Sequence, residues 1–175
     1  MTAAETFAQL AKHMIKGLMV HDQMTNYFDF LGLDGFRLEQ EKHYREESEN
    51  YHKLCHFYMS HYHMLINPGE IGNPNLIPQS WFKHVRSDVD SATKRNGIEN
   101  AFSEWKKWEL EARKTYEESY KELMSLNEVS AALFLVDFIE DVDEELELID
   151  RRILALRSVD YDLVYVNELQ DQNSK

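Results

Sequence analysis

The sequence predicts an all-α fold, a four-helix bundle with one long crossover connection and room for a short C-terminal helix. Only 6 of the 175 residues are Gly and 3 are Pro, so helices can run for many turns without interruption. The three prolines, Pro68, Pro74 and Pro78, lie close together and mark one irregular connection. Hydrophobic residues make up 43% of the chain and recur elsewhere at helical spacing. The length suits a single domain, residues 1–175, with a sizeable core.

Two helices are predicted before the prolines. The first covers residues 4–31, where one face repeats at helical spacing Phe7, Leu10, Met14, Leu18, His21 and Phe28. The second covers residues 36–66 and follows a break with turn chemistry at residues 32–35. Its inner line is apolar at both ends and polar in the middle, which is unusual for a bundle helix. That line comprises Phe36, Gln40, His43, Glu47, Asn50, Leu54, Phe57 and His61.

The connection at 67–98 is too long for a tight hairpin. It is predicted to cross the bundle from end to end, which distinguishes a bundle with a crossover from a simple up-and-down one. Asn67-Pro68-Gly69 is expected to end the second helix. Within the connection, Trp81, Phe82 and Val85 favour a short helix that packs onto the bundle.

Two more long helices are predicted after the crossover. The third covers residues 98–126, and its inner face holds Phe102, Trp105, Glu109, Ala112, Tyr116 and Leu123. The fourth covers residues 129–157, with Leu135, Phe138, Val142, Leu146, Ile149 and Ile153 directed inward. Residues 159–169 are expected to form a short fifth element, and residues 170–175 a flexible polar tail.

Three carboxylates, Glu47, Glu109 and Glu144, fall on or beside the apolar stripes of three different helices. A buried carboxylate without a partner is unfavourable, so such groups are paired, protonated or bound to a cation. Acidic side chains that converge from several helices of a bundle form carboxylate-bridged metal sites. The alternative is a set of salt bridges, for which Lys106 and Arg113 are available partners.

The charge and composition of the chain exclude several kinds of binding partner and location. The net charge of −13 argues against a nucleic-acid backbone or an anionic membrane as the main partner, and it is compatible with solubility and with attraction of cations. The single cysteine, Cys55, excludes an intramolecular disulfide. No signal peptide and no apolar run of 18 or more residues is evident, so a cytoplasmic protein is expected.

The chain resembles the bacterial non-haem ferritins. In that family a Gly-Leu-Glu-Gly-Phe-like turn joins the first two helices and a His-x-x-Glu-Glu-x-x-His run follows. Here residues 32–36 read Gly-Leu-Asp-Gly-Phe, and His43 and Glu46-Glu47 follow at the family's spacing. The segments 102–109 and 140–145 are similar to the family's third-helix segment and fourth-helix acidic cluster. The resemblance extends over most of residues 5–157.

This resemblance implies a ferroxidase centre, the family's two-iron site. Position by position, Glu47, Glu109 and Glu144 match the family's ligands, and Asp141 replaces a Gln or Glu. The metal ligands predicted from the resemblance are therefore Glu47, Glu109, Asp141 and Glu144, holding one or two non-haem iron ions.

Two positions depart from the family's pattern. Met14 stands where the first-helix Glu is expected, and Asn50 stands where the second-helix His is expected. An amide is a poorer ligand than an imidazole for iron(II), so these departures weaken a two-iron site. His21 is one candidate to replace the lost ligation. A second registration uses the literal Glu-x-x-His of Glu49 and His52, which lie well around the helix from the inner line.

The resemblance implies iron(II) oxidation, iron storage or both, with oxygen or peroxide as electron acceptor and a large homo-oligomer as the assembly. In this interpretation the enzyme is a ferroxidase-type oxidoreductase. The second hypothesis, favoured by Met14 and Asn50, is a catalytically degenerate ferritin-fold protein that acts as a structural or interaction module.

Overall fold

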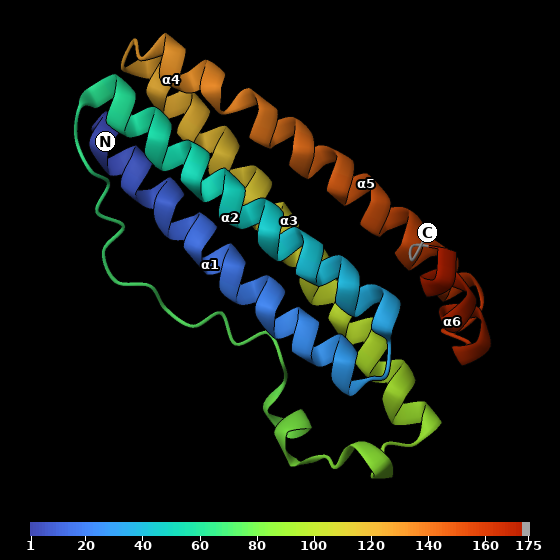
Figure 1. The fold of residues 1–175 in the computed structure, drawn as a ribbon. Coiled ribbons are helices and arrows are strands. Elements are labelled where there is room, and N and C mark those ends of the chain that lie inside the picture. The colour runs from blue at the N-terminus through green and yellow to red at the C-terminus, as the bar shows by residue number, and fades with distance from the viewer. Residues whose placement is uncertain (173–175) are drawn as a thin grey trace.

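The computed structural model describes residues 1–172 and contains a four-helix bundle with a short C-terminal helix (Figure 1). The elements in chain order are α1 (Ala3–Phe30), α2 (Asp34–Tyr62), the 3₁₀ helices η1 (Gln79–Lys83) and η2 (Arg86–Asp88), α3 (Ser91–Ser125), α4 (Val129–Phe134), α5 (Val136–Ser158) and α6 (Leu163–Gln172). The predicted all-α bundle with one long crossover is confirmed.

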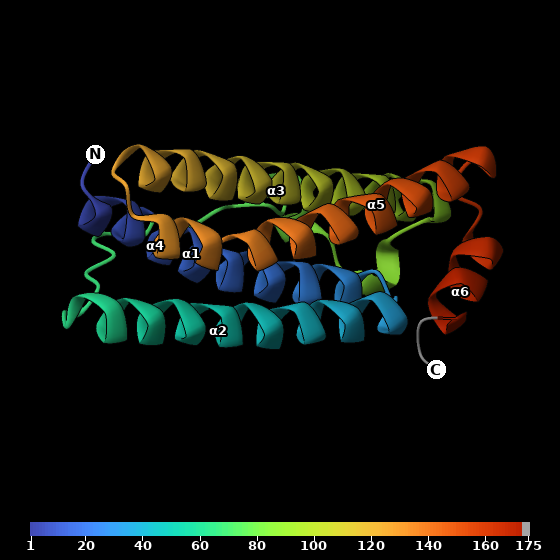
Figure 2. The same ribbon diagram turned by 90° about the horizontal axis from the view of Figure 1, so that it is seen from above.

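The crossover makes α2 and α3 run in the same direction. α1 and α2 form an antiparallel hairpin, and the chain then returns along the outside of α1 before α3 begins near the α1–α2 turn (Figures 1 and 2). α4 and α5 together form the fourth long rod of the bundle, and α6 lies across the end at which α2 begins (Figure 2). α1 packs against α2 and α3, and α3 packs against α5.

Local hydrogen bonds fix where the helices begin and end. Thr2 and Glu5 form a capping box at the start of α1, in which the Glu5 amide donates to the Thr2 hydroxyl at 3.2 Å. The Asp90 carboxylate caps α3 by accepting from the Thr93 amide at 2.7 Å. Gly32 follows the end of α1 with a φ of 71°, a left-handed conformation that glycine adopts without strain.

The connection between α2 and α3 is offset from its predicted bounds. It spans residues 63–90 and not 67–98, because both neighbouring helices differ from expectation. His63 takes a left-handed conformation with a φ of 55° and ends α2 before Asn67 is reached. The Asp90 cap starts α3 seven residues earlier than predicted, at Ser91. The short helix expected near Trp81 is present as η1.

Two predictions for the last third of the chain need correction. The fourth helix is broken at Leu135, where the Leu135 amide donates to the Ala132 carbonyl at 3.0 Å, a tighter turn than the α-helical one. The predicted tail 170–175 is not free at its start, because α6 continues to Gln172 and Gln170 is buried against Gly35. The rest of that tail, residues 173–175, lies outside the described residues.

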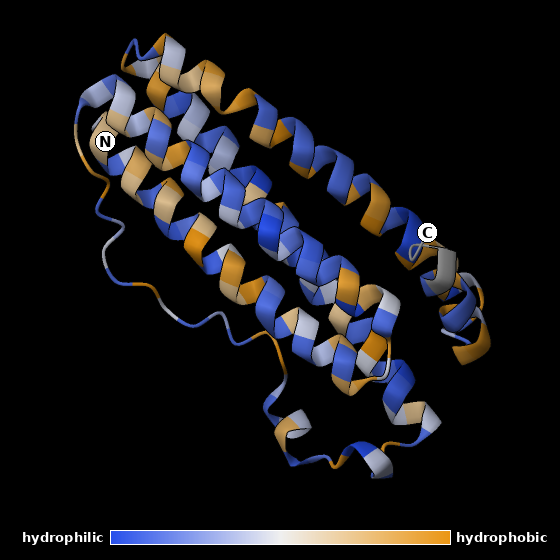
Figure 3. Ribbon diagram, in the orientation of Figure 1, coloured by the Kyte–Doolittle hydropathy of each residue, from blue (hydrophilic) through white to orange (hydrophobic). Residues whose placement is uncertain are grey.

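The core consists of two apolar clusters with polar side chains between them. One cluster lies near the α1–α2 turn and includes Phe28, Phe36, Phe102 and Trp105. The other lies near the opposite end of the bundle and includes Phe7, Leu10, Leu54, Tyr116, Leu135 and Phe138. Hydrophilic residues colour the middle of α2 (Figure 3). Among residues 1–172, no helix has the combined length and apolar character of a membrane span.

Candidate metal centre

A polar cavity of about 770 Å³ lies between α2 and α5, with α1 and α3 contributing one residue each. Acidic side chains dominate its lining. The lining residues are His21, Lys42, His43, Glu46, Glu47, Glu49, Asn50, Lys53, Glu109, Asp141, Val142, Glu144, Glu145, Glu147, Leu148 and Arg151. All four metal ligands predicted from the sequence are among them. The fold therefore brings all four side chains to one cavity.

Glu109, on α3, is the most deeply buried carboxylate of the cavity. Its side chain is 6% exposed, and the Trp105 indole N–H donates to Glu109 Oε1 at 3.2 Å. Burial raises the pKa of Glu109 to about 8, and the neighbouring Glu145 carboxylate acts in the same direction. At neutral pH the metal-free group is therefore mainly protonated, and a bound cation would favour its ionised form.

Glu47, on α2, reaches across to the backbone of α1. A Cβ built on Gly17 would stand 2.8 Å from Glu47 Oε1, so the carboxyl group lies in a space that only glycine leaves open. Burial raises the pKa of Glu47 to about 8, although the nearby His43 opposes this shift. Gly17 thus explains how a carboxyl group fits tightly against the first helix.

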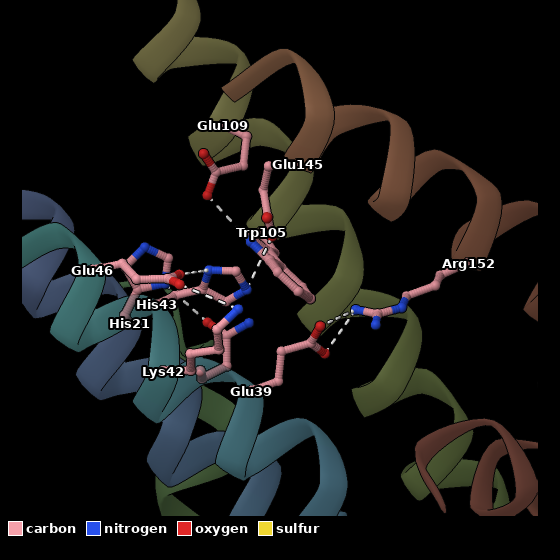
Figure 4. A network of polar contacts seen from close by, with 10 residues as sticks. His21, Glu39, Lys42, His43, Glu46, Trp105, Glu109, Glu145 and Arg152 are labelled. Carbon is pink, nitrogen blue, oxygen red and sulfur yellow. Dashed lines mark hydrogen bonds and ion pairs between the residues drawn. The ribbon is translucent and has the colours of Figure 1, made fainter. Parts of the chain in front are cut away.

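His43, on α2, stands between two carboxylates (Figure 4). Its Nδ1 lies 3.3 Å from Glu46 Oε2 on the same helix, and its Nε2 lies 3.1 Å from Glu145 Oε1 on α5. Burial alone would lower the pKa of His43, but the hydrogen bond with Glu46 and the charges of Glu145, Glu39 and Glu109 outweigh burial and raise it. The raised pKa favours the positively charged form of His43 beside these carboxylates.

His21, on α1, is a buried and neutral imidazole. Its Nδ1 lies 3.0 Å from Gln40 Oε1, and its ring faces that of His43 with centroids 5.6 Å apart. Burial lowers the pKa of His21 to about 4, and the positive charge of His43 acts in the same direction. The ring therefore stays neutral at physiological pH and can act as a lone-pair donor.

A second charge pair links α2 to α5 below the cavity. Arg152 Nη1 lies 2.7 Å from Glu39 Oε1, with the two side chains only 7% and 13% exposed. The guanidinium also lies over the rings of Phe36 and Trp105, at 5.7 and 6.0 Å from their centroids. Together with the contact between His43 and Glu145, this pair joins two helices across the cavity.

The four predicted ligands divide into two groups. Glu47 and Glu109 reach into the protein, whereas Asp141 and Glu144 are exposed and line the rim of the cavity. Asn50 also lines the cavity, and Met14 is fully buried in an apolar cluster. That the four predicted residues bind a metal stays a prediction.

In the alternative registration, which uses Glu49 and His52 as ligands, only Glu49 lines the cavity. Glu49 lines the rim and is exposed, and His52 is exposed and not among the residues that line the cavity. His21, the other candidate ligand, does line it.

Glu145, the fourth-helix carboxylate that does point inward, was not predicted from the sequence. Its position was readable, because Glu145 lies three residues after Val142 and four before Ile149, both of which are buried. The run of acidic residues at 140–145 concealed this regularity. As the side chains stand, no three His, Cys, Asp or Glu residues within 1–172 are arranged closely enough to hold a metal ion. Metal binding would therefore require side-chain rotation.

Comparison with solved structures identifies the fold. A humanized archaeal ferritin superposes with a TM-score of 0.80 at 19% identity, over 98% of this chain and 94% of that one. An open-pore ferritin from the hyperthermophilic archaeon Archaeoglobus fulgidus gives a TM-score of 0.78 at 20% identity, over 98% and 95% of the two chains. A variant of PmFTN soaked in iron gives 0.77 at 12% identity, over 96% of each.

No protein-family model and no curated protein matches the sequence. The resemblance in sequence and the likeness in structure therefore agree on one conclusion, that this chain has a ferritin-like fold. At these identities the likeness concerns the fold alone.

Proposed function

We propose that this protein binds iron(II) in the cavity between α2 and α5 and oxidises it, stores it, or both. One observation carries the proposal: Glu47 and Glu109, from two helices, place buried carboxyl groups at one polar cavity of a ferritin-like bundle. Carboxylate oxygens are hard ligands that favour iron(III) over iron(II). Each iron(II) would give up one electron, with oxygen or peroxide as the acceptor.

The rim residues have a different place in this proposal. Asp141 and Glu144 are exposed, so they would meet a hydrated cation before it reaches Glu47 and Glu109. The net charge of −13 would increase the local concentration of cations at such an acidic opening. A cytoplasmic location and assembly into a homo-oligomer are parts of the same proposal.

The experiment is an anaerobic titration of the metal-free protein with iron(II), followed by exposure to air. Binding of one or two iron ions per chain, with iron(III) absorbance appearing faster than in buffer, would support the proposal. Oxidation no faster than in buffer, with no bound iron(II), would contradict it.

A second candidate is a ferritin-fold protein with a structural or interaction role. It is favoured by the fully buried Met14, which brings no ligand from α1, and by Arg152 and His43, which already pair with carboxylates of α2 and α5. The same titration separates the two candidates, because a purely structural protein would neither bind nor oxidise iron(II).

A further inference from the structure

Four cationic side chains near the start of α3 have no carboxylate partner. They are Lys83, Arg86, Lys94 and Arg95, and none of them forms an ion pair within residues 1–172. Most other Lys and Arg side chains of the long helices do pair with a carboxylate. In a protein with a net charge of −13, a segment of unpaired cations is unexpected, and its positive charge is available to an external anion.

Two of these cations converge on the turn between α1 and α2. A Cβ built on Gly32 would lie 3.6 Å from Arg86 Nη2 and 3.8 Å from Lys94 Nζ. Arg86 belongs to η2 and Lys94 to the first turn of α3, so two segments distant from Gly32 in the sequence bring their charges to one point. Figure 1 shows the start of α3 near this turn. The two nitrogens are therefore close enough for one small anion to contact both.

The space beside Gly32 is open. Apart from the neighbours of Gly32 in the chain, the Arg86 and Lys94 nitrogens are the only atoms of residues 1–172 within 4 Å of that Cβ position. Gly32 has a φ of 71°, a conformation that glycine adopts readily, and it leaves no side chain between the two cations. Arg86 is exposed and Lys94 is half-buried, so an anion can reach this space from solvent.

The two charges repel each other when no anion lies between them. Burial lowers the pKa of Lys94, and the Arg86 guanidinium acts in the same direction. α1 has no basic residue in its last turn, so the carbonyl groups at its end attract both cations. A helix end carries only about half an elementary charge, however, and offsets a minor part of two full positive charges. An anion bound between Arg86 and Lys94 would offset the remainder.

We propose that Arg86 and Lys94, together with the open space at Gly32, bind a phosphate group. The Arg86 guanidinium can donate two parallel N–H groups to phosphate oxygens, and the Lys94 ammonium adds a compact positive charge. A phosphate group carries about −1.5 to −2 charges at pH 7 and has oxygens in several directions, so one group can accept from both side chains. The inference goes beyond the proposed function and does not depend on a metal in the cavity.

Phosphorus NMR of the chelator-treated protein, titrated with inorganic phosphate at low ionic strength, tests the site. The phosphate line should broaden in a saturable way. Arg86→Gln and Lys94→Gln should each weaken binding by about tenfold or more, because each removes a charge-assisted hydrogen bond. Lys83→Gln is the matched control, since it removes an exposed charge from the same segment but not from the space at Gly32, and its affinity should stay within about twofold of wild type. No saturable broadening in wild type, or equal weakening in all three variants, would overturn the proposal.

A further variant tests the open space without a change of charge. Gly32→Asn keeps both cations and places an amide between them, and Asn tolerates the left-handed conformation better than most residues. Phosphate binding should weaken by about tenfold in this variant, while circular dichroism shows that the helices are retained. Wild-type affinity for phosphate in Gly32→Asn would overturn the placement of the anion beside Gly32.

Adenosine monophosphate distinguishes two sources of the phosphate group. If it binds as well as inorganic phosphate does, and depends on Arg86 and Lys94 in the same way, the site accepts a phosphate ester. If only inorganic phosphate binds, the site accepts the free ion; both outcomes support the proposal. Binding of adenosine monophosphate alone would overturn it, since the base or the ribose would then carry the recognition. The protein is metal-free in these titrations, so phosphate held by bound iron is excluded and the result does not depend on iron oxidation.

Discussion

Replacing Glu47 by Gln should stabilise the metal-free protein, and by more at high pH than at low pH. Burial raises the pKa of Glu47 to about 8 from its ordinary value of 4.5, so the folded state holds a proton that the unfolded chain releases between these values. Stability from this group is complete below pH 4.5 and is lost as the pH rises through about 8. Gln has nearly the same shape and carries no such proton.

The size of the effect follows from the two pKa values. At about 1.4 kcal/mol per pH unit, retaining the proton costs the wild-type protein roughly 4 kcal/mol at pH 7.5 and about 1 kcal/mol at pH 5. The difference of about 3 kcal/mol corresponds to a shift in Tm of about 6–12 °C for a domain of this size. Glu47→Gln should therefore gain far more in Tm at pH 7.5 than at pH 5.

Differential scanning calorimetry of the chelator-treated proteins at both pH values measures this gain. Comparison with wild type at each pH removes the contributions of other titrating groups, such as Glu109 and His21, which both proteins share. Glu144→Gln is the control, because its side chain is exposed and the same change of charge there should give a gain that does not grow with pH. An equal gain at both pH values, or a loss at pH 7.5, would refute the assignment of Glu47 as a buried proton carrier.

Three further predictions test the packing around the cavity. Glu109→Ala should abolish or sharply reduce iron(II) binding while circular dichroism stays helical, because the cavity is not the main source of core stability; wild-type iron binding would show that the site is elsewhere. Gly17→Ala should not raise Tm in the wild type, since the new Cβ meets the Glu47 carboxyl group. In a Glu47→Ala background the same substitution should add about 1 kcal/mol of helix stability. Equal effects of Gly17→Ala on Tm in both backgrounds would exclude the contact between Gly17 and Glu47. Arg152→Leu should lower the free energy of unfolding in urea by about 3–5 kcal/mol, because it leaves Glu39 buried without its partner. Adding Glu39→Leu should restore much of this loss. An unchanged free energy of unfolding in Arg152→Leu would mean that the pair is not buried in solution.

The helices and the inward positions of Glu47 and Glu109 could be derived from the sequence, because both depend on spacing along one helix. The 3.6-residue period placed Glu47 and Glu109 on inner stripes, and the structure directs both carboxyl groups into the protein. The ends of the helices were harder to predict. The start of α3 depends on an Asp90 cap within a polar segment. The end of α2 depends on a left-handed conformation of His63, which no local sequence pattern indicates.

Contacts between segments that are distant in the sequence could not be predicted from it. The pairing of His43 with Glu145 depends on how α2 and α5 are rotated toward each other. On α5, acidic residues occur on several faces of the helix within 140–145, so composition alone did not distinguish the exposed Glu144 from the inward Glu145. Gly17 illustrates the same limit, because the reason for a glycine in mid-helix lies on another helix.

The long crossover has a consequence for how the cavity comes into being. His21, His43 and Glu47 belong to the α1–α2 hairpin, whereas Glu109 and Glu145 belong to the hairpin formed by α3 with α4 and α5. Residues 63–90 connect these halves, and Leu76, Ile77 and Trp81 of this segment pack against the apolar cluster near the α1–α2 turn. The cavity therefore lies along the seam between two hairpins. If the chain is divided within residues 63–90 and the two halves are co-expressed, they should associate and restore the polar cavity. Failure of the halves to form a complex would show that residues 63–90 also guide their docking.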